Sequence, residues 1–167
     1  MANVIKLLDR ENLQYSGVFN FEEFLEHARS WLSWRKFDIE EKRFEEKVKL
    51  GREYKIWWYA VKCIDEYSAI RIVFELSITD VIDVEVQIDK KKKKMQKGDI
   101  NIYITSELIT DRQDYWTQNA FFSFLRGFYD RYIYASTIDK LKGEAWNLGW
   151  GFFNELKSFL QLYKYSE

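Results

Sequence analysis

The sequence predicts a single α+β domain, residues 1–167, in which a curved antiparallel sheet of about four to six strands carries its helices on one face. Apolar residues recur at helical spacing near both ends of the chain, and they alternate with polar residues in between. No stretch rich in Pro, Gly or Ser divides the chain, and 167 residues is a length typical of one domain. These observations indicate a meander of strands between terminal helices.

The first part of the chain predicts one or two strands within residues 4–19, followed by a helix that starts at Asn20. The Asn20 side chain can accept the N–H of Glu23, and Glu23 can reach back, as in a capping box. One apolar stripe follows at helical spacing, formed by Phe21, Phe24, Leu25, Ala28, Trp31 and Leu32.

The middle of the chain has a period of two, which predicts strands. We expect them at 37–49, with a bulge or bend between 40 and 43, and at 53–64, 69–78, 82–88 and 100–108. Pairing 53–64 with 70–78 so that Ala60 faces Phe74, and 82–88 with 100–104 so that Val86 faces Ile102, leaves one face uniformly apolar. A Lys-rich loop would then close the second hairpin.

The helical period returns after Asp111 in one or two helices, with a break near residues 136–137 and Thr137 as a new N-cap. Gly143, Gly149 and Gly151 lower helix propensity, but small residues permit a close backbone approach. This order of elements is similar to that of helix-grip ligand-binding folds, in which a long C-terminal helix covers a curved sheet. The resemblance concerns the fold and implies no particular residue role.

Composition excludes several classes of protein. A single Cys and a single His exclude a disulfide framework and sites rich in Cys or His, so we expect no metal and no cofactor. A net charge of −1 shows no global basic character. Neither a signal peptide nor an apolar run of about 20 residues is visible, so the sequence predicts a soluble, cytoplasmic protein without a membrane span.

Aromatic residues, 19% of the chain, suggest the leading functional hypothesis. They lie on the stripes that face each other between sheet and C-terminal helices, where they could line an apolar cavity. The protein would then be a non-enzymatic binding domain for an apolar or amphipathic small molecule. The predicted pocket residues are Trp58, Phe74, Trp116, Phe124 and Phe128.

A second hypothesis concerns the opposite parity of the strand at 53–64, which is also apolar. Trp57, Tyr59 and Val61, together with Val73, would point away from the Trp58 face. Such a patch is either covered by the N-terminal segment or used as an interface. It suggests a module for protein interaction or homo-oligomerisation, with a homodimer as one form.

A third hypothesis rests on the lysine run. Lys90, Lys91, Lys92, Lys93 and Lys94 form the sharpest charge feature of a chain that is otherwise acidic. They could dock RNA or another anionic surface, or they could be a solvated hairpin tip. The run lacks the Arg and stacking aromatics that usually accompany nucleic-acid contacts.

No complete catalytic set is visible, so binding is favoured over enzymatic activity. His27 follows Glu23 by one helical turn, and Asp83 and Glu85 share a strand face, but each has a simpler interpretation as a surface group. Cys63 would face Arg71 in the predicted register, which could activate a thiol, yet no base accompanies it.

Overall fold

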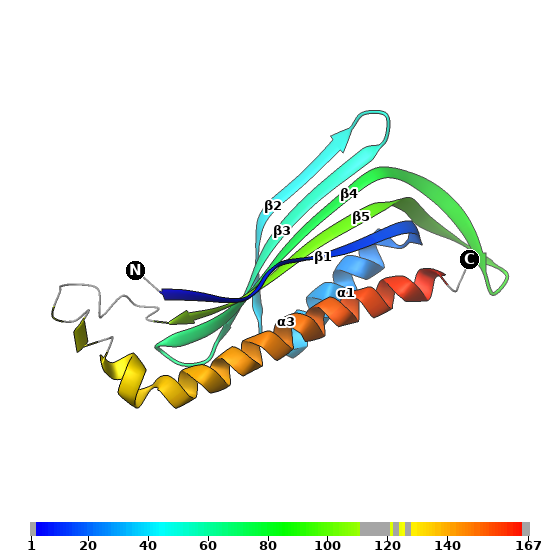
Figure 1. Ribbon diagram of the computed structural model, residues 1–167. Helices are drawn as coiled ribbons and strands as arrows, with labels where there is room; N and C mark the ends of the chain where they lie inside the picture. Colours follow the sequence, from blue (N-terminus) through cyan, green and yellow to red (C-terminus); the bar gives the residue numbers. More distant parts are fainter. Residues whose placement is uncertain (1–2, 111–120, 122–123, 126–127, 165–167) are drawn as a thin grey trace.

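The described strands form one open, five-stranded antiparallel sheet, and α1 and α3 pack on one of its faces (Figure 1). This computed structural model describes residues 3–110, 121, 124–125 and 128–164. The strand order is β1-β5-β4-β3-β2, so β1 and β2 are the edges. The predicted α+β class is confirmed. The elements are β1 (Asn3–Phe19), α1 (Phe21–Trp34), β2 (Asp38–Val48), β3 (Arg52–Cys63), β4 (Ser68–Ile88), β5 (Lys91–Thr110), the π-helical turn η2 (Tyr129–Ile133) and α3 (Ala135–Lys164).

The core lies between the helices and the sheet face toward them, which we call the inner face. Trp58 and Phe74 are fully buried there, with ring centroids 5.0 Å apart, and Phe152 of α3 packs edge-on against Phe74 at 5.7 Å. Burying one such side chain contributes roughly 1.5–3 kcal/mol. This contact therefore attaches the long C-terminal helix firmly to the centre of the sheet.

A glycine lets α3 approach the sheet closely, as the sequence predicts. A Cβ atom on Gly149 would lie 2.6 Å from Leu8 Cδ1 and 2.7 Å from Ser106 Cβ. At the same level the Ser106 hydroxyl donates a hydrogen bond to the Ala145 carbonyl at 2.7 Å. Gly143 has open space around it, so close approach explains the glycine at 149 and not the one at 143.

Helix α1 begins where the capping signal predicts. The Asn20 Oδ1 atom accepts the Glu23 amide at 3.0 Å, and Asn20 itself is extended. The Glu23 carboxylate does not complete the predicted capping box, because its oxygens bond to residues of other elements. It accepts from Lys93 of β5 and from the Tyr163 hydroxyl of α3, so it joins the helix to both neighbours.

The pairing of β3 with β4 corrects the predicted register by two residues. Ala60 faces Ile72, where Phe74 was predicted, and Trp58 faces Phe74. A shift of two residues keeps every side chain on its face because the side-chain period of a strand is two. The sequence therefore predicts the correct sheet face for each of these side chains, although it assigns the wrong cross-strand partners.

The β4–β5 hairpin differs more from the prediction. Residues 68–88 form one strand in place of two, with a register irregularity between Thr79 and Ile82, and Ile102 faces Leu76 in place of Val86. The hairpin turns at Asp89 and Lys90, both at positive φ (49° and 64°), as in a type I′ turn. The lysines after the turn belong to β5, so Ile88 pairs with Lys91, nine residues before its predicted partner Ile100.

One smaller prediction is confirmed and another is corrected. The register of β2 against β3 shifts between Glu41 and Arg43, where a bulge was expected. A helical break does separate η2 from α3, but α3 begins at Ala135, so Thr137 lies inside the helix and is not its N-cap.

Candidate binding face

The sheet face that turns away from α1 and α3, which we call the outer face, carries aromatic and charged side chains. Among the described elements, both helices pack on the opposite face (Figure 1). On β3, β4 and β5, strand alternation directs these side chains outward because their neighbours along the strand are buried in the core, and residues of β1 and β2 join the face through their cross-strand partners. The outer face comprises Arg10, Asn12, Asp38, Glu40, Lys42, Arg43, Glu45, Lys55, Trp57, Tyr59, Val61, Arg71, Val73, Glu75, Ser77, Asn101, Tyr103, Thr105 and Glu107.

All four residues of the predicted interface lie on the outer face. Trp57 and Tyr59 form an edge-to-face pair with ring centroids 6.0 Å apart. Val61 lies next along the same strand, and Val73 lies across from Tyr59 on β4. The N-terminal segment does not cover them, because residues 3–19 form the edge strand β1. Their use as an interface stays a prediction.

Cations lie over the rings of this face. The Arg71 guanidinium is 4.9 Å from the centroid of Tyr59, and the Lys42 ammonium lies 5.2 Å from that same centroid. The Arg10 guanidinium lies 4.4 Å from the centroid of Tyr103. A cation over a ring face gains about 0.5–1 kcal/mol at an exposed site. These contacts hold long side chains flat against the sheet.

Carboxylates fix two of these arginines from the side. Arg71 Nε donates to Glu107 Oε2 at 2.7 Å, and Arg10 Nε lies 3.3 Å from Glu75 Oε2. The first pair is largely buried and the second is half exposed. The guanidinium groups are thus held in place before any partner arrives.

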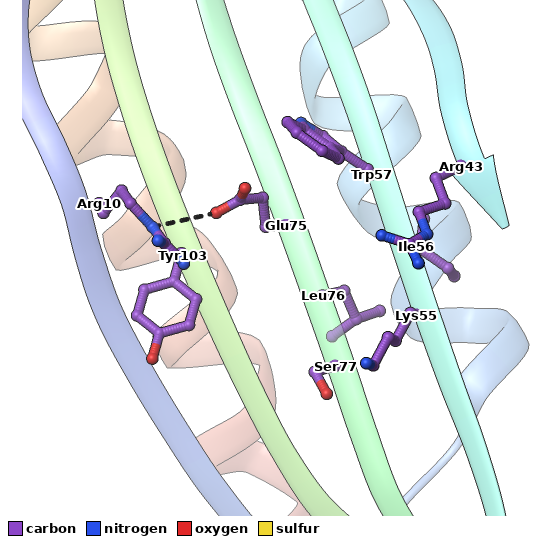
Figure 2. A pocket seen from close by; sticks show the side chains of 9 residues that line it. All are labelled: Arg10, Arg43, Lys55, Ile56, Trp57, Glu75, Leu76, Ser77 and Tyr103. Atoms are coloured by element: carbon purple, nitrogen blue, oxygen red, sulfur yellow. Dashed lines mark ion pairs between the residues drawn. The ribbon is translucent and has the colours of Figure 1, made fainter. Parts of the chain in front are cut away.

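A hollow of about 200 Å³ lies at the centre of the outer face. Figure 2 views it with the helices behind the strands, and the side chains of Arg10, Tyr103, Glu75 and Trp57 stand on the near side. Its lining contains three cationic side chains and one carboxylate, and that carboxylate is bonded to Arg10. The lining residues are Arg10, Arg43, Lys55, Ile56, Trp57, Glu75, Leu76, Ser77 and Tyr103.

At the rim of the hollow, Arg43 forms an ion pair with Glu45. Its guanidinium donates to Glu45 Oε1 at 2.8 Å from Nε. This hydrogen bond is the main cause that lowers the pKa of the Glu45 carboxyl, against an opposing effect of desolvation, and Lys47 and Lys55 add to it. Glu45 therefore stays ionised and Arg43 stays paired.

Two polar atoms at the hollow and its rim have no partner. Trp57 Nε1, a donor, and Glu45 Oε2, an acceptor, are shielded from solvent and make no hydrogen bond within the described residues. An indole N–H can only donate, and an ionised carboxylate can only accept. Buried polar groups are nearly always bonded in folded proteins, so these two atoms are exceptions.

The residues of the predicted pocket are not brought together by the described structure. Trp58 and Phe74 are buried against each other, whereas the side chains of Phe124 and Phe128 are 71% and 52% exposed. Trp116 lies outside the described residues. The apolar-ligand pocket stays a prediction.

The five lysines divide between two faces of the β4–β5 hairpin. Lys90 is in the turn, and Lys91 and Lys93 alternate with Lys92 and Lys94 along β5. Lys93 bonds to Glu23 of α1, and Lys94 faces Glu85 across the hairpin. A planar basic patch of all five is not formed.

The other candidate residues have ordinary partners. His27 Nε2 is 3.0 Å from Glu155 Oε1 on α3, and its ring stacks on Phe159. Asp83 pairs with Arg52. Cys63 is exposed and faces Ala69, where Arg71 was predicted.

The described residues offer neither a metal site nor a membrane-spanning helix. They contain no group of three or more His, Cys, Asp or Glu side chains that could hold a metal ion. None of the described helices has the length and apolar character needed to cross a membrane.

Most of the hollow was missed by sequence reasoning. Arg10, Arg43, Glu75 and Tyr103 come from four strands and were not singled out. Strand alternation could have identified two of them. Glu75 is two residues after Val73 on β4, so both side chains point to the same sheet face. The predicted bulge in β2 places Arg43 beside Trp57. Finding the set also required the correct registers.

Comparisons with protein-family models, with curated proteins and with solved structures found no match to this chain.

Proposed function

We propose that this protein is a non-enzymatic binding module that docks a protein partner on its outer face. The single observation that carries the proposal is the set of rings and cations held ready on a sheet face that bears neither α1 nor α3. Trp, Tyr and Arg are the residues most enriched at the energetic centres of protein interfaces. Fixing their side chains beforehand reduces the entropy lost on binding.

The balance of charge favours a protein over a polyanion. Acidic and basic side chains occur in near-equal numbers across the outer face. The acidic ones include Asp38, Glu40, Glu45, Glu75 and Glu107, and the basic ones include Arg10, Arg43, Lys55 and Arg71. A phosphate backbone needs a continuous basic track, whereas a protein surface can match alternating signs.

We propose the cytoplasm as the compartment of this binding function. Support comes from Cys63, an exposed free thiol, which suits a reducing environment.

The test compares two aspartate substitutions at aromatic positions, Tyr59 on the sheet and Trp34 on a helix. Tyr59→Asp puts a charge on the outer face, and Trp34→Asp puts one on α1, where Trp34 is 83% exposed. Tagged full-length chains would capture partners from an extract of the source cells, after melting curves have shown that each variant is folded. A second variant, Trp57→Ala, tests the same face without adding charge.

The proposal expects a partner that is captured by the wild-type chain and by Trp34→Asp, and is lost with Tyr59→Asp and with Trp57→Ala. Capture that is unchanged by both outer-face variants would contradict it. Capture lost only with Trp34→Asp would move the binding site to the helices.

A further inference from the structure

We propose that the hollow on the outer face is a receptor for a carboxylate, supplied by an acidic segment of the protein partner. This inference rests on the proposed function and specifies the chemistry of its partner. The occupant we infer is an Asp or Glu side chain next to an aromatic residue, presented by a peptide segment. The charges, the hydrogen-bond donors and the rings of the hollow each support it.

The charge of the hollow is unbalanced in favour of cations. Arg10 is paired with Glu75, and Arg43 is paired with Glu45. Lys55 makes no ion pair within the described residues, although it lies across from Glu45 in the sheet. One incoming carboxylate would balance the lysine without breaking either existing pair, since carboxylates accept from several donors at once.

The hydrogen-bonding groups around the hollow are mainly donors. Arg10, Arg43 and Lys55 bring groups that only donate, and Ser77 brings a hydroxyl. Lysine, arginine and indole groups can donate but cannot accept. An ionised carboxylate is an acceptor only, and so it complements this lining better than an amide or a hydroxyl would.

The rings specify what stands beside the carboxylate. Trp57 and Tyr103 border the hollow on β3 and β5 (Figure 2), and Tyr103 is backed by Arg10. Two rings at the edges suit an aromatic neighbour on the ligand, packed edge-on or offset. The hollow, of about 200 Å³, has room for one side chain and not for a folded element.

A phosphodiester chain fits the surroundings poorly. Beyond the rim the outer face presents Glu45, Glu40 and Asp38 on β2. A nucleic acid continuing past the hollow would meet these carboxylates, and like charges in close contact are destabilising. A peptide with a single acidic anchor would not.

The experiment uses the full-length chain labelled with 15N and the indole N–H resonance of Trp57, assigned through the Trp57→Phe variant. The probes are acetyl-Glu-Tyr-Glu-amide and its uncharged counterpart acetyl-Gln-Tyr-Gln-amide, with inorganic phosphate and an oligothymidylate as competing chemistries. The acidic peptide is expected to shift the Trp57 resonance saturably. Lys55→Gln is expected to weaken that binding about fivefold, the effect of one exposed ion pair.

The matched control is Lys157→Gln, which removes the same charge from an exposed position on α3. It should leave the affinity for the acidic peptide unchanged. Raising the salt concentration should weaken binding to the wild-type chain more than to Lys55→Gln.

Several results would overturn the inference. An equal response to the Gln peptide, or no effect of Lys55→Gln, would show that the hollow does not recognise a carboxylate. Binding of phosphate or oligothymidylate as tight as that of the acidic peptide would show a general anion site. Self-association lost with Trp57→Ala and kept with Lys55→Gln would make a second copy the occupant.

Failure of this inference differs from failure of the proposed function. If Tyr59→Asp abolishes partner capture while Lys55→Gln leaves it intact, the outer face binds the partner but the carboxylate receptor is wrong. If the acidic peptide binds but capture survives Tyr59→Asp, the receptor is supported and the docking function is contradicted.

Discussion

The carboxylate of Glu107 is buried on the outer face of the sheet, and Arg71 holds it there with Nε 2.7 Å from Oε2. The same guanidinium lies over the ring of Tyr59. One arginine therefore neutralises a buried acid and supports an aromatic side chain of the proposed docking surface.

Removing Arg71 should destabilise the protein because it leaves Glu107 buried without a partner. Arg71 is partly exposed, so we expect Arg71→Leu to cost about 2 kcal/mol, below the range for a fully buried pair. Urea unfolding would measure this. Arg71→Leu with Glu107→Leu should cost less than Arg71→Leu alone, because no buried charge remains. A double variant less stable than the single one would contradict this account.

Two helix glycines should respond in opposite directions to alanine. Gly149→Ala should destabilise by about 1–3 kcal/mol, because the new methyl would overlap Leu8 and Ser106. Gly143→Ala should stabilise by about 0.5–1 kcal/mol, because its surroundings are open and alanine favours a helix. Thermal melts of the two variants provide the comparison. Equal effects at both positions would show that α3 does not approach β1 and β5 as closely as described.

Asp65 should make the protein lose stability in acid. Burial by itself raises the pKa of this carboxyl, but hydrogen bonds from Ser68, Tyr134 and the Tyr67 amide together outweigh it and lower the pKa below the usual 3.8. A lowered folded-state pKa contributes stability above the unfolded-state value and loses it as the pH falls through the folded-state value. That loss therefore lies below about pH 4.

The Asp65→Asn variant tests this pH dependence. It should be less stable than the wild type at pH 7, by about 1 kcal/mol, and the difference should shrink as the pH is lowered from 4 to 2. Unfolding measured across this range is the readout. Tyr134→Phe removes one of the bonds at 3.0 Å and should give a smaller version of that effect. A difference independent of pH would exclude the carboxyl as its source.

The N-cap of α1 offers a local test. Asn20→Ala removes the acceptor for the Glu23 amide and should cost about 1 kcal/mol. Asn20→Asp keeps an acceptor and adds a charge that favours a helix N-terminus, so it should retain most of the stability. Circular dichroism during urea unfolding would measure both. Equal losses for the two variants would argue that the cap is not formed.

The sequence by itself determined the properties that depend on short-range periodicity. The alternation around Trp57 and Trp58 predicts which side chains point to each face, and Asn20 predicts where α1 begins. These predictions survive a register error of two residues, because the pleat repeats every two residues and a helix cap involves only one turn.

Only the tertiary structure decided which residues meet across strands. The positive-φ turn at Asp89 and Lys90 sets the start of the β4–β5 pairing, and that pairing places Tyr103 beside Glu75. Arg10 on β1 pairs with Glu75 on β4, 65 positions later in the chain. The pair spans β5, and it forms only because the sheet places β1 and β4 on either side of that strand. A hollow lined from all five strands depends on every register between them, and a register is a long-range property that periodicity does not encode.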